Sequence, residues 1–410
     1  MSEEETERIN QVAHSTHGRM QPDSMRSLLT NEAQLTNMPL VDGNRLTLLI
    51  DGPSTLQAMF ELIEQAEKEI LCEYYILADD QIGQQFAEHL SRATARGVEV
   101  KVIYDALGSM HTAERFFQNL REAGIEVEAD KSPLVAPHKV NNRNHRKMIV
   151  IDNRTAIIGG ANVTEAYASS SATSPGRVRG LNSSWRDTNL ALKGPAVYYY
   201  REIFRQDWHQ LTGTTLATAS PAPEAGKARV RPVYDDTDDG EHTTNIYQIY
   251  VNAIEHAEHN IWFTHAYFSP NQKLLDLLTD AAARGVDVRL VLPGFIDFSL
   301  IYHASRANYH RLLEAGVRVF ERNDALLHAK TAVIDGVWST VGSANLDIRS
   351  FIHNDEANAV VISESFAEIM EDRFIQDMRK ADEIRLEEWR QRSLRNKILE
   401  WLAQRLNYFL

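Results

Sequence analysis

The sequence predicts an α/β fold of two tandem, similar domains, each a mostly parallel or mixed sheet flanked by helices. Three observations lead to this prediction. Helical and strand-like segments alternate along the chain, one short motif occurs twice at distant positions, and other segments recur in the same order. The chain has 410 residues, which suits two domains of ordinary size with full cores.

In the first half, helix and strand patterns alternate up to the motif. An amphipathic segment, LQAMFELIEQAEKEI, runs into the strand-like ILCEYYIL. A second helix, IGQQFAEHLSRATARG, ends at Gly97 before the strand VEVKVIYDAL, and FFQNLREAG then leads into IEVEAD. The second half repeats this order with IYVNAIEHAEHN, IWFTHAYFS, KLLDLLTDAAARG, VDVRLVLPG, YHRLLEAG and VRVFERN. Such alternation favours α/β layers around largely parallel strands.

The two halves arise from a duplication. Three segments recur with nearly the same letters: AEKEI as AEHNI, ARGVEV as ARGVDV, and EAGIEV as EAGVRV. With the repeated motif they keep their order at a nearly constant separation. A repeat of this length is a duplicated domain, because the units of a solenoid are far shorter.

The repeated motif is His-x-Lys-x4-Asp, followed by Gly-x-Ala-Asn. Its residues are His145, Lys147, Asp152 and Asn162 in the first copy, and His328, Lys330, Asp335 and Asn345 in the second. Each His-x-Lys begins a run, MIVID or TAVID, that is typical of a buried strand. Along such a strand the His and Lys of each copy point the same way, and the Asp faces away. An imidazole beside an ammonium group suits phosphoryl chemistry, whereas we interpret both Asp residues as mainly structural.

Composition sets the domain boundaries and the broad class. We predict a polar tail at 1–40 that is disordered or loosely packed, domains at 41–210 and 228–380, a linker rich in small residues and Pro at 211–227, and a C-terminal amphipathic helix at 381–410. The lone Cys72 fits a reducing compartment, and no apolar run reaches the 18 or so residues that a spanning helix needs. The net charge of −14 disfavours nonspecific nucleic-acid binding.

The paired motifs with their GGAN and GSAN endings resemble the phospholipase D superfamily from about residue 46 to 377. Within it, NLDIRSFIHNDEANAVV and EYYILADDQIG are similar to bacterial cardiolipin synthases. THAYFSP departs from their TxPYFxP segment, since Ala266 stands where that pattern has Pro. The chain is similar to the shorter type, without paired N-terminal membrane spans. The resemblance implies two domains related by a pseudo-twofold axis, with one site between them.

The resemblance also implies a two-step mechanism without a metal or other cofactor. His145 would be the nucleophile that becomes a phosphohistidine, and His328 the acid and base. The oxygens of the transition state would be held by Lys147, Lys330, Asn162 and Asn345. Two histidines of ordinary pKa, about 6.5, can divide roles that one cannot combine in a single step.

Each histidine should have a carboxylate that fixes its tautomer. The family position suggests Asp187, in SWRDTNLAL, and Glu356, in HNDEANAVV, although each could be an ordinary surface or loop carboxylate. Tyr75 and Tyr267 could line the site or pack in the core. The other histidines lack the spacing of a metal site.

Two segments relate to membranes. Residues 393–410 place Leu394, Ile398, Trp401, Leu402, Leu406 and Phe409 at helical spacing among basic residues, which fits either an interfacial helix on acidic lipid or a helix packed on protein. Residues 294–309 are unusually apolar for a loop. They could form a buried helix, but we favour an acyl-chain entrance beside the site.

The leading functional hypothesis is a phosphatidyltransferase that makes cardiolipin from phosphatidylglycerol or a related donor. The alternatives are a hydrolytic phospholipase D that releases phosphatidic acid, a phosphodiesterase nuclease, and a non-enzymatic scaffold. The acidic surface counts against the nuclease, and the two intact motifs count against the scaffold. We expect a phospholipid substrate, no nucleic acid, and peripheral attachment to the cytoplasmic face of a bacterial cell membrane. The sequence leaves the acceptor alcohol and the oligomeric state open.

Overall fold

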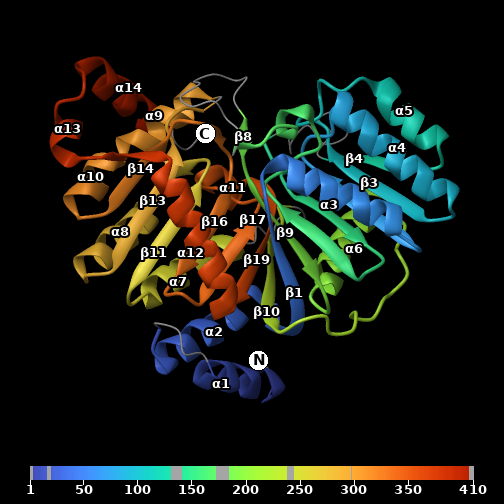
Figure 1. The fold of residues 1–410 in the computed structure, drawn as a ribbon, viewed down its shortest axis with the longest axis horizontal. Helices are drawn as coiled ribbons and strands as arrows, with labels where there is room; N and C mark the ends of the chain where they lie inside the picture. The colour runs from blue at the N-terminus through green and yellow to red at the C-terminus, as the bar shows by residue number, and fades with distance from the viewer. Residues whose placement is uncertain are drawn as a thin grey trace.

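Helices and strands alternate through both halves of the computed structural model, which describes residues 3–15, 20–130, 141–171, 184–237, 244–296 and 298–405 (Figure 1). Two helices precede the first half, α1 (Glu3–Ser15) and α2 (Pro22–Thr36). The first half contains β1 (Val41–Ile50), α3 (Asp51–Gln65), β2 (Glu69–Tyr74), α4 (Gln81–Ala95), β3 (Glu99–Asp105), α5 (Glu114–Glu122), β4 (Glu126–Asp130), β5 (Arg143–Asn144), β6 (Lys147–Ile151), β7 (Thr155–Gly159), the 3-10 helix η2 (Glu165–Tyr167), β8 (Trp185–Arg186), β9 (Thr188–Lys193) and α6 (Val197–Thr212).

The second half repeats this order with a few additions. It contains β10 (Ala228–Asp235), α7 (Asn245–His256), β11 (Asn260–His265), β12 (Phe268–Ser269), α8 (Gln272–Ala283), β13 (Asp287–Pro293), α9 (Ser299–Ala307), α10 (Tyr309–Glu314), β14 (Arg318–Arg322), β15 (Leu326–Leu327), β16 (Lys330–Ile334), β17 (Trp338–Gly342), β18 (Leu346–Asp347), α11 (Ile348–Ile352), β19 (Asn354–Ile362) and α12 (Glu364–Arg379). The chain continues through β20 (Ala381–Ile384), α13 (Leu386–Arg390) and α14 (Leu394–Arg405).

One continuous mixed sheet runs through both halves. Its order is β20-β14-β13-β11-β16-β17-β19-β10-β1-β9-β7-β6-β2-β3-β4. The strands of the two halves follow the same order outward from the central antiparallel pair of β1 and β10, where Val41 lies opposite Val230. The parallel pairs are β2 with β3 and β3 with β4 in one half, and β11 with β13 and β13 with β14 in the other. The predicted fold class is confirmed, with the two sheets joined edge to edge.

Helices cover both faces of this sheet. Along β2, Leu71 packs in one hydrophobic cluster while Ile70 and Cys72 pack in another, as the alternation of side chains along a strand requires. The Leu71 cluster includes apolar residues of α6 and α12 and extends across both halves. On the other face, α3, α4 and α5 cover the first half, and α7, α8 and α10 cover the second.

The expectation of a loosely packed N-terminal tail is wrong for the described residues. In α2, Met25, Leu28 and Leu29 are buried and join the hydrophobic cluster of the second half, beside α7. Glu32, one turn further on, is also buried and accepts a hydrogen bond of 2.8 Å from Trp338 Nε1. The apolar stripe of α2 is short and lies among polar residues. The average composition of the segment therefore hides an apolar face that the helical spacing of Met25, Leu28 and Leu29 indicates. Both helices lie at the end of the molecule marked N (Figure 1).

At the other end of the chain, α14 packs against α9. Its buried residues are Glu400 and Ala403, whereas Leu394, Ile398, Trp401 and Leu402 are exposed. Leu406 and Phe409, which we grouped with them, lie outside the described residues. In the described ranges, no helix combines the length and the apolar character needed to cross a membrane.

Candidate active site

Both copies of the motif reach one cavity of about 480 Å³ that is lined by residues of both halves. His145, Asn162, His328 and Asn345 all contribute to its wall. The two lysines lie behind the histidines and are buried. Lys147 Nζ donates a hydrogen bond of 2.5 Å to the carbonyl oxygen of His145, and Lys330 makes the same contact with His328. The duplication thus builds one site from two copies.

Short strands that cross between the halves position the histidines. The strand β5 precedes His145 and pairs in parallel with β19 of the second half, and His145 N donates to Asp355 O at 2.9 Å. The strand β15 precedes His328 and pairs in parallel with β8 of the first half, and His328 N donates to Arg186 O at 2.8 Å. Each histidine therefore lies just before its predicted strand, which begins at the lysine, and is held by backbone of the other half.

This exchange decides which carboxylate each histidine meets. His145 Nδ1 lies 2.9 and 3.0 Å from the carboxylate oxygens of Glu356, the residue after Asp355. His328 Nδ1 lies 2.8 Å from Asp187 Oδ2, the residue after Arg186. A carboxylate accepts hydrogen bonds, so we assign the proton of each neutral ring to Nδ1, which leaves the Nε2 lone pair available. The structure thus brings together the four residues proposed as catalytic pairs, each pair formed across the halves.

Burial dominates the electrostatics of the site. It lowers the pKa of His145 to about 4, although Glu356 opposes the shift. Burial and the neighbouring Lys330 also lower the pKa of His328. The pKa of Lys147 falls to about 7 for the same reason, because a buried ammonium group loses its hydration. Burial would raise the pKa of Glu356, but the charge and hydrogen bond of His145 bring it below its usual value.

The two copies differ around the carboxylates. A Cβ at Gly160 would lie 2.3 Å from Asp187 Oδ1, so the close approach of this carboxylate requires glycine. The matching residue of the second copy is Ser343, whose hydroxyl donates to Glu356 Oε2. On the glycine side, the Tyr167 hydroxyl lies 3.0 Å from His328 Nδ1 instead. The two histidines therefore have different hydrogen-bond environments.

The asparagines and aspartates of the motif occupy distinct places. Asn162 Oδ1 accepts a hydrogen bond of 3.0 Å from Ile76 N. Asn345 Oδ1 is buried and has no hydrogen-bond partner within the described part of the chain. Asp152 and Asp335 lie in left-handed turns after their strands, and their carboxylates accept backbone N–H groups of residues 67–69 and 258–260. These contacts favour the structural interpretation of both aspartates.

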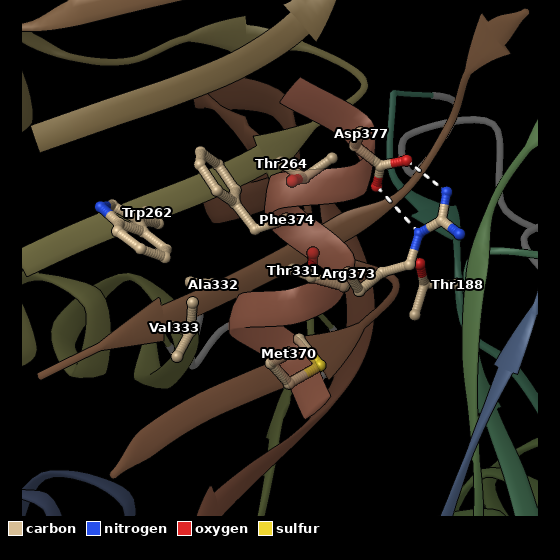
Figure 2. A pocket seen from close by; sticks show the side chains of 10 residues that line it. All are labelled: Thr188, Trp262, Thr264, Thr331, Ala332, Val333, Met370, Arg373, Phe374 and Asp377. Carbon is tan, nitrogen blue, oxygen red and sulfur yellow. Dashed lines mark hydrogen bonds and ion pairs between the residues drawn. The ribbon is translucent and has the colours of Figure 1, made fainter. Parts of the chain in front are cut away.

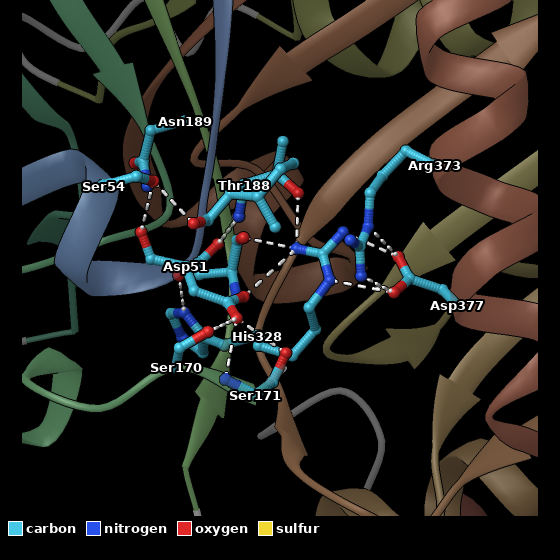
Figure 3. Close-up of polar contacts among 12 residues, drawn as sticks. Asp51, Ser54, Ser170, Ser171, Thr188, Asn189, His328, Arg373 and Asp377 are labelled. Carbon is cyan, nitrogen blue, oxygen red and sulfur yellow. Dashed lines mark hydrogen bonds and ion pairs between the residues drawn. The ribbon is translucent and has the colours of Figure 1, made fainter. Parts of the chain in front are cut away.

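A buried ion network adjoins the segment that carries Asp187. Asp377 of α12 accepts hydrogen bonds from Arg186, Arg322 and Arg373, with Arg186 Nε at 2.9 Å and Nη2 at 2.6 Å. Its contact with Arg373 is drawn in Figures 2 and 3. The three guanidinium groups hold the pKa of Asp377 well below its usual value even though burial opposes this. Since Arg186 also holds the backbone of His328, this network fixes part of the site.

Apolar packing beneath α12 supports the same region. Figure 2 shows Phe374 and Met370 of this helix beside Trp262 and Val333 of the sheet. The rings of Trp262 and Phe374 stack with their centroids 5.1 Å apart. The helix that carries Asp377 is therefore anchored by hydrophobic contacts on the sheet face that α6 also covers.

Other residues around the cavity were missed or left open by sequence reasoning. Tyr75 and Tyr267 both line it, and the Tyr75 ring centroid lies 5.0 Å from that of His145. Trp185, missed before, lies 5.1 Å from the His328 ring between centroids. The missed polar residues are Tyr167, Ser343, Asn354, Arg143 and Arg349. The signal available was proximity in sequence, since Ser343 and Arg143 lie two positions from a motif residue and Asn354 lies two positions from Glu356.

The segment at 294–309 supplies part of the cavity wall. Phe298 and Ile301, at the start of α9, line it, while Ala304 and Ser305 are the buried residues of that helix. Asp297 lies outside the described residues. Because Phe298 and Ile301 line the same cavity as His145 and His328, the segment is not a wholly buried helix, and the acyl-chain entrance stays a prediction.

Comparison with known proteins agrees with this geometry. The family described as "Cardiolipin synthase, PLD-like domain" matches residues 59–208 and 250–378. Cardiolipin synthase of Geobacillus kaustophilus (strain HTA426) is 35% identical over 394 residues, covering 94% of this chain and 76% of the relative. Cardiolipin synthase A of Pseudomonas fluorescens (strain SBW25) is 35% identical over 364 residues, covering 87% and 73%.

Two solved structures share the fold. Phosphatidylserine synthase from Haemophilus influenzae Rd KW20 superposes with a TM-score of 0.67 and 15% identity, covering 92% of this chain and 97% of the other. Polyphosphate kinase from Porphyromonas gingivalis superposes with a TM-score of 0.56 and 16% identity, covering 84% and 49%. These two structures show the fold alone. The family match over both halves and the relatives at 35% identity show that the chain belongs to the cardiolipin synthase family of phospholipase D-like enzymes.

Proposed function

We propose that this protein transfers a phosphatidyl group from one phosphatidylglycerol molecule to a hydroxyl group of another, giving cardiolipin and glycerol through a phosphohistidine on His145. The observation that carries this proposal is the pair of histidines in one cavity, each held through Nδ1 by a carboxylate of the opposite half. Such a pair supplies a nucleophile and a proton carrier at one phosphorus atom.

In the first step, Nε2 of His145 attacks phosphorus and the bond to the glycerol oxygen breaks. The lowered pKa of His145 supports this role, because the ring stays neutral and keeps its lone pair at neutral pH. His328 gives a proton to the departing glycerol oxygen. A bound anionic phosphate favours protonation of that ring, since opposite charges in a buried site attract strongly.

In the second step, His328 removes a proton from the hydroxyl group of the incoming phosphatidylglycerol. The new oxygen attacks phosphorus, the phosphorus–nitrogen bond breaks, and His145 returns to its starting state. Two attacks from opposite sides retain the configuration at phosphorus. The exclusion of water from the cavity at this stage decides between transfer and hydrolysis, because water can attack the same intermediate.

The proposed ligands of the nonbridging oxygens are Lys147, Lys330, Asn162 and Asn345. Both asparagines line the cavity, and the NH2 group of a side-chain amide can donate hydrogen bonds to phosphate oxygens. A phosphate would raise the lowered pKa of Lys147 and fix its charge. Two cations and two amides can stabilise the oxygens of the transition state without a metal ion.

The proposed partner of the protein is the surface of an anionic bilayer, at the cytoplasmic face of a bacterial cell membrane. The exposed apolar residues of α14 support this contact, together with Arg395, Lys397 and Arg405 on the same helix. Phe298, at the start of the adjacent α9, is 53% exposed and also lines the cavity. An apolar surface flanked by basic residues suits an interface rather than water.

The test uses the full chain with labelled phosphatidylglycerol in liposomes and identifies the lipid products. We expect labelled cardiolipin and released glycerol. Phosphatidic acid as the main product would replace this proposal with the hydrolytic alternative.

Variants of the two histidines test the roles. His145→Asn should abolish turnover and the covalent adduct, whereas His328→Asn should leave an adduct on His145 when the donor carries a good leaving group. His310→Asn, at an exposed histidine of α10, is the matched control and should keep full activity. An adduct mapped to His328 would reverse the assignment.

A further inference from the structure

Two arginines line the cavity in addition to the residues proposed for the reacting phosphate. Arg143 belongs to β5, two residues before His145, and Arg349 belongs to α11 of the other half. Both are partly exposed, so each guanidinium can reach a molecule in the cavity. The planar fork of arginine suits a phosphate with two oxygens facing it.

The fold holds these two cations close together. Arg349 donates hydrogen bonds to the side chain and the carbonyl oxygen of Asn141, at 3.3 and 2.9 Å, which places it beside the start of β5. Burial lowers the pKa of Arg143; the Asp105 carboxylate opposes this shift, and the neighbouring charge of Arg349 adds to it. Two like charges at one place are unfavourable in the empty site, and an anion would relieve their repulsion.

The carboxylates near the arginines are occupied by backbone groups. Asp105 accepts N–H groups of Leu107, Gly108 and Asn144, at 2.7 to 2.9 Å. Asp347 caps α11 through Ser350 N at 2.7 Å. Burial raises the pKa of both carboxyl groups to about 6, so both remain largely ionised at neutral pH. Asp347 also lines the cavity, and its carboxylate, like that of Asp105, is compensated by backbone N–H groups, so the two guanidinium groups can still attract an anion.

The proposed reaction brings two phosphodiesters to the cavity. The first is attacked by His145, and the second belongs to the acceptor phospholipid, whose free glycerol hydroxyl must reach the same phosphorus atom. The lysines and asparagines of the motif provide for one phosphate only. A hydrolase would need no second anion site, since water carries no charge.

We infer that Arg143 and Arg349 bind the phosphodiester of the acceptor phospholipid and so select a charged lipid over water or a neutral alcohol in the second step. This inference rests on the proposed transferase function. It assigns to the arginines a specificity role after the intermediate has formed. Their positions support it, because Arg143 enters beside His145, where the acceptor must approach the phosphohistidine.

The experiment measures how one intermediate is divided between two acceptors. Vesicles of labelled phosphatidylglycerol are incubated with the enzyme and 1-butanol, and cardiolipin and phosphatidylbutanol are quantified together. Since both products come from the same phosphohistidine, their ratio is independent of the rate of the first step. Arg143→Gln and Arg349→Gln should each lower the ratio of cardiolipin to phosphatidylbutanol about 10- to 100-fold, as expected for loss of a hydrogen bond between charged groups.

Conservative variants and a surface control complete the design. Arg143→Lys and Arg349→Lys keep the charge but lose the fork, so their ratios should lie between those of the glutamine variants and the wild type. Arg115→Gln, at an exposed arginine of α5, should leave the ratio unchanged. Phosphatidylbutanol formation itself reports that each variant is folded and forms the intermediate.

The possible outcomes separate the two proposals. If the wild type makes phosphatidylbutanol but no cardiolipin, the proposed function fails and this inference fails with it. If the wild type makes cardiolipin and the glutamine variants keep its product ratio, only the inference is overturned. An equal loss of both products would also overturn it, since the arginines would then act on the reacting phosphate.

Discussion

Replacing Asp377 by asparagine should destabilise the protein and impair the site at the same time. The change keeps the size of the side chain but removes the single negative charge that faces Arg186, Arg322 and Arg373. Arg322 keeps Asp324 as a second ion-pair partner, whereas Arg186 keeps hydrogen bonds to Asp187 O and Thr188 Oγ1 and a distant ion pair of 3.9 Å with Asp51. The variant therefore leaves buried positive charge without full compensation.

The size of the effect follows from burial. Asp377 is 1% exposed, and breaking a buried ion pair by removing one partner costs about 3–5 kcal/mol. An unfolding entropy of about 2.1 cal/mol/K per residue over 410 residues converts this to a fall in Tm of roughly 3–6 °C. The low pKa of Asp377 in the folded protein makes this contribution present above pH 4 or so, and it is lost as the pH falls further.

Activity should fall as well, because Arg186 O accepts the backbone hydrogen bond of His328 and Asp187 is its neighbour in sequence. A displacement on the order of 1 Å at a catalytic group can lower kcat about 100-fold. Thermal unfolding gives Tm, and phosphatidyl transfer measured well below Tm gives kcat. Asp372→Asn makes the same charge change at an exposed position of the same helix and should alter neither. An Asp377→Asn protein with the Tm and kcat of the control would refute this reasoning.

Three further predictions concern metal, pH and membrane. Activity on a short-chain soluble donor should survive EDTA; loss restored by a stoichiometric divalent ion would contradict the proposed role of the two lysines. The folded protein keeps His145 neutral down to about pH 4, whereas the unfolded chain protonates it below about pH 6.5. The free energy of unfolding should therefore decrease as the pH falls from about 6.5 to about 4. His145→Asn should flatten that decline in a series of Tm measurements, and an unchanged slope would argue against it. Trp401→Asp should weaken binding to anionic liposomes without changing activity on the soluble donor. Gln404→Asp makes the same charge change and should bind the liposomes more tightly than Trp401→Asp. Equal binding by the two variants would exclude α14 as the contact.

The sequence predicted the parts of the fold that depend on local patterns. The duplication and the α/β class follow from repeated letters and from helix and strand periods, whereas the clustering of both motifs at one site was implied by the resemblance to the phospholipase D superfamily. The face of α2 formed by Met25, Leu28 and Leu29 was overlooked, because polar neighbours dominate the composition of the N-terminal segment. The helical spacing of these residues was informative, but their significance depended on packing against α7, which composition does not show.

Pairing between the halves lay beyond sequence reasoning. Asp187 and Glu356 were chosen as histidine partners, yet spacing alone gave no reason for His145 to meet the carboxylate of the other copy. That choice is made by β5 and β15, which are two residues long and carry no strand pattern of their own. Tyr167 was missed for a similar reason, since its approach to His328 depends on the path of the chain after Asn162.

The reciprocal strand exchange has an evolutionary consequence. A single copy of this domain would hold a histidine and a carboxylate that belong to different active sites, so it could act only by associating with a second copy. In a pair of identical copies, both histidines would necessarily have the same surroundings. In one fused chain that constraint is absent, and the two copies do differ at matching positions, with Gly160 in the first and Ser343 in the second. Specialisation of the two histidines became possible once each could mutate without its twin.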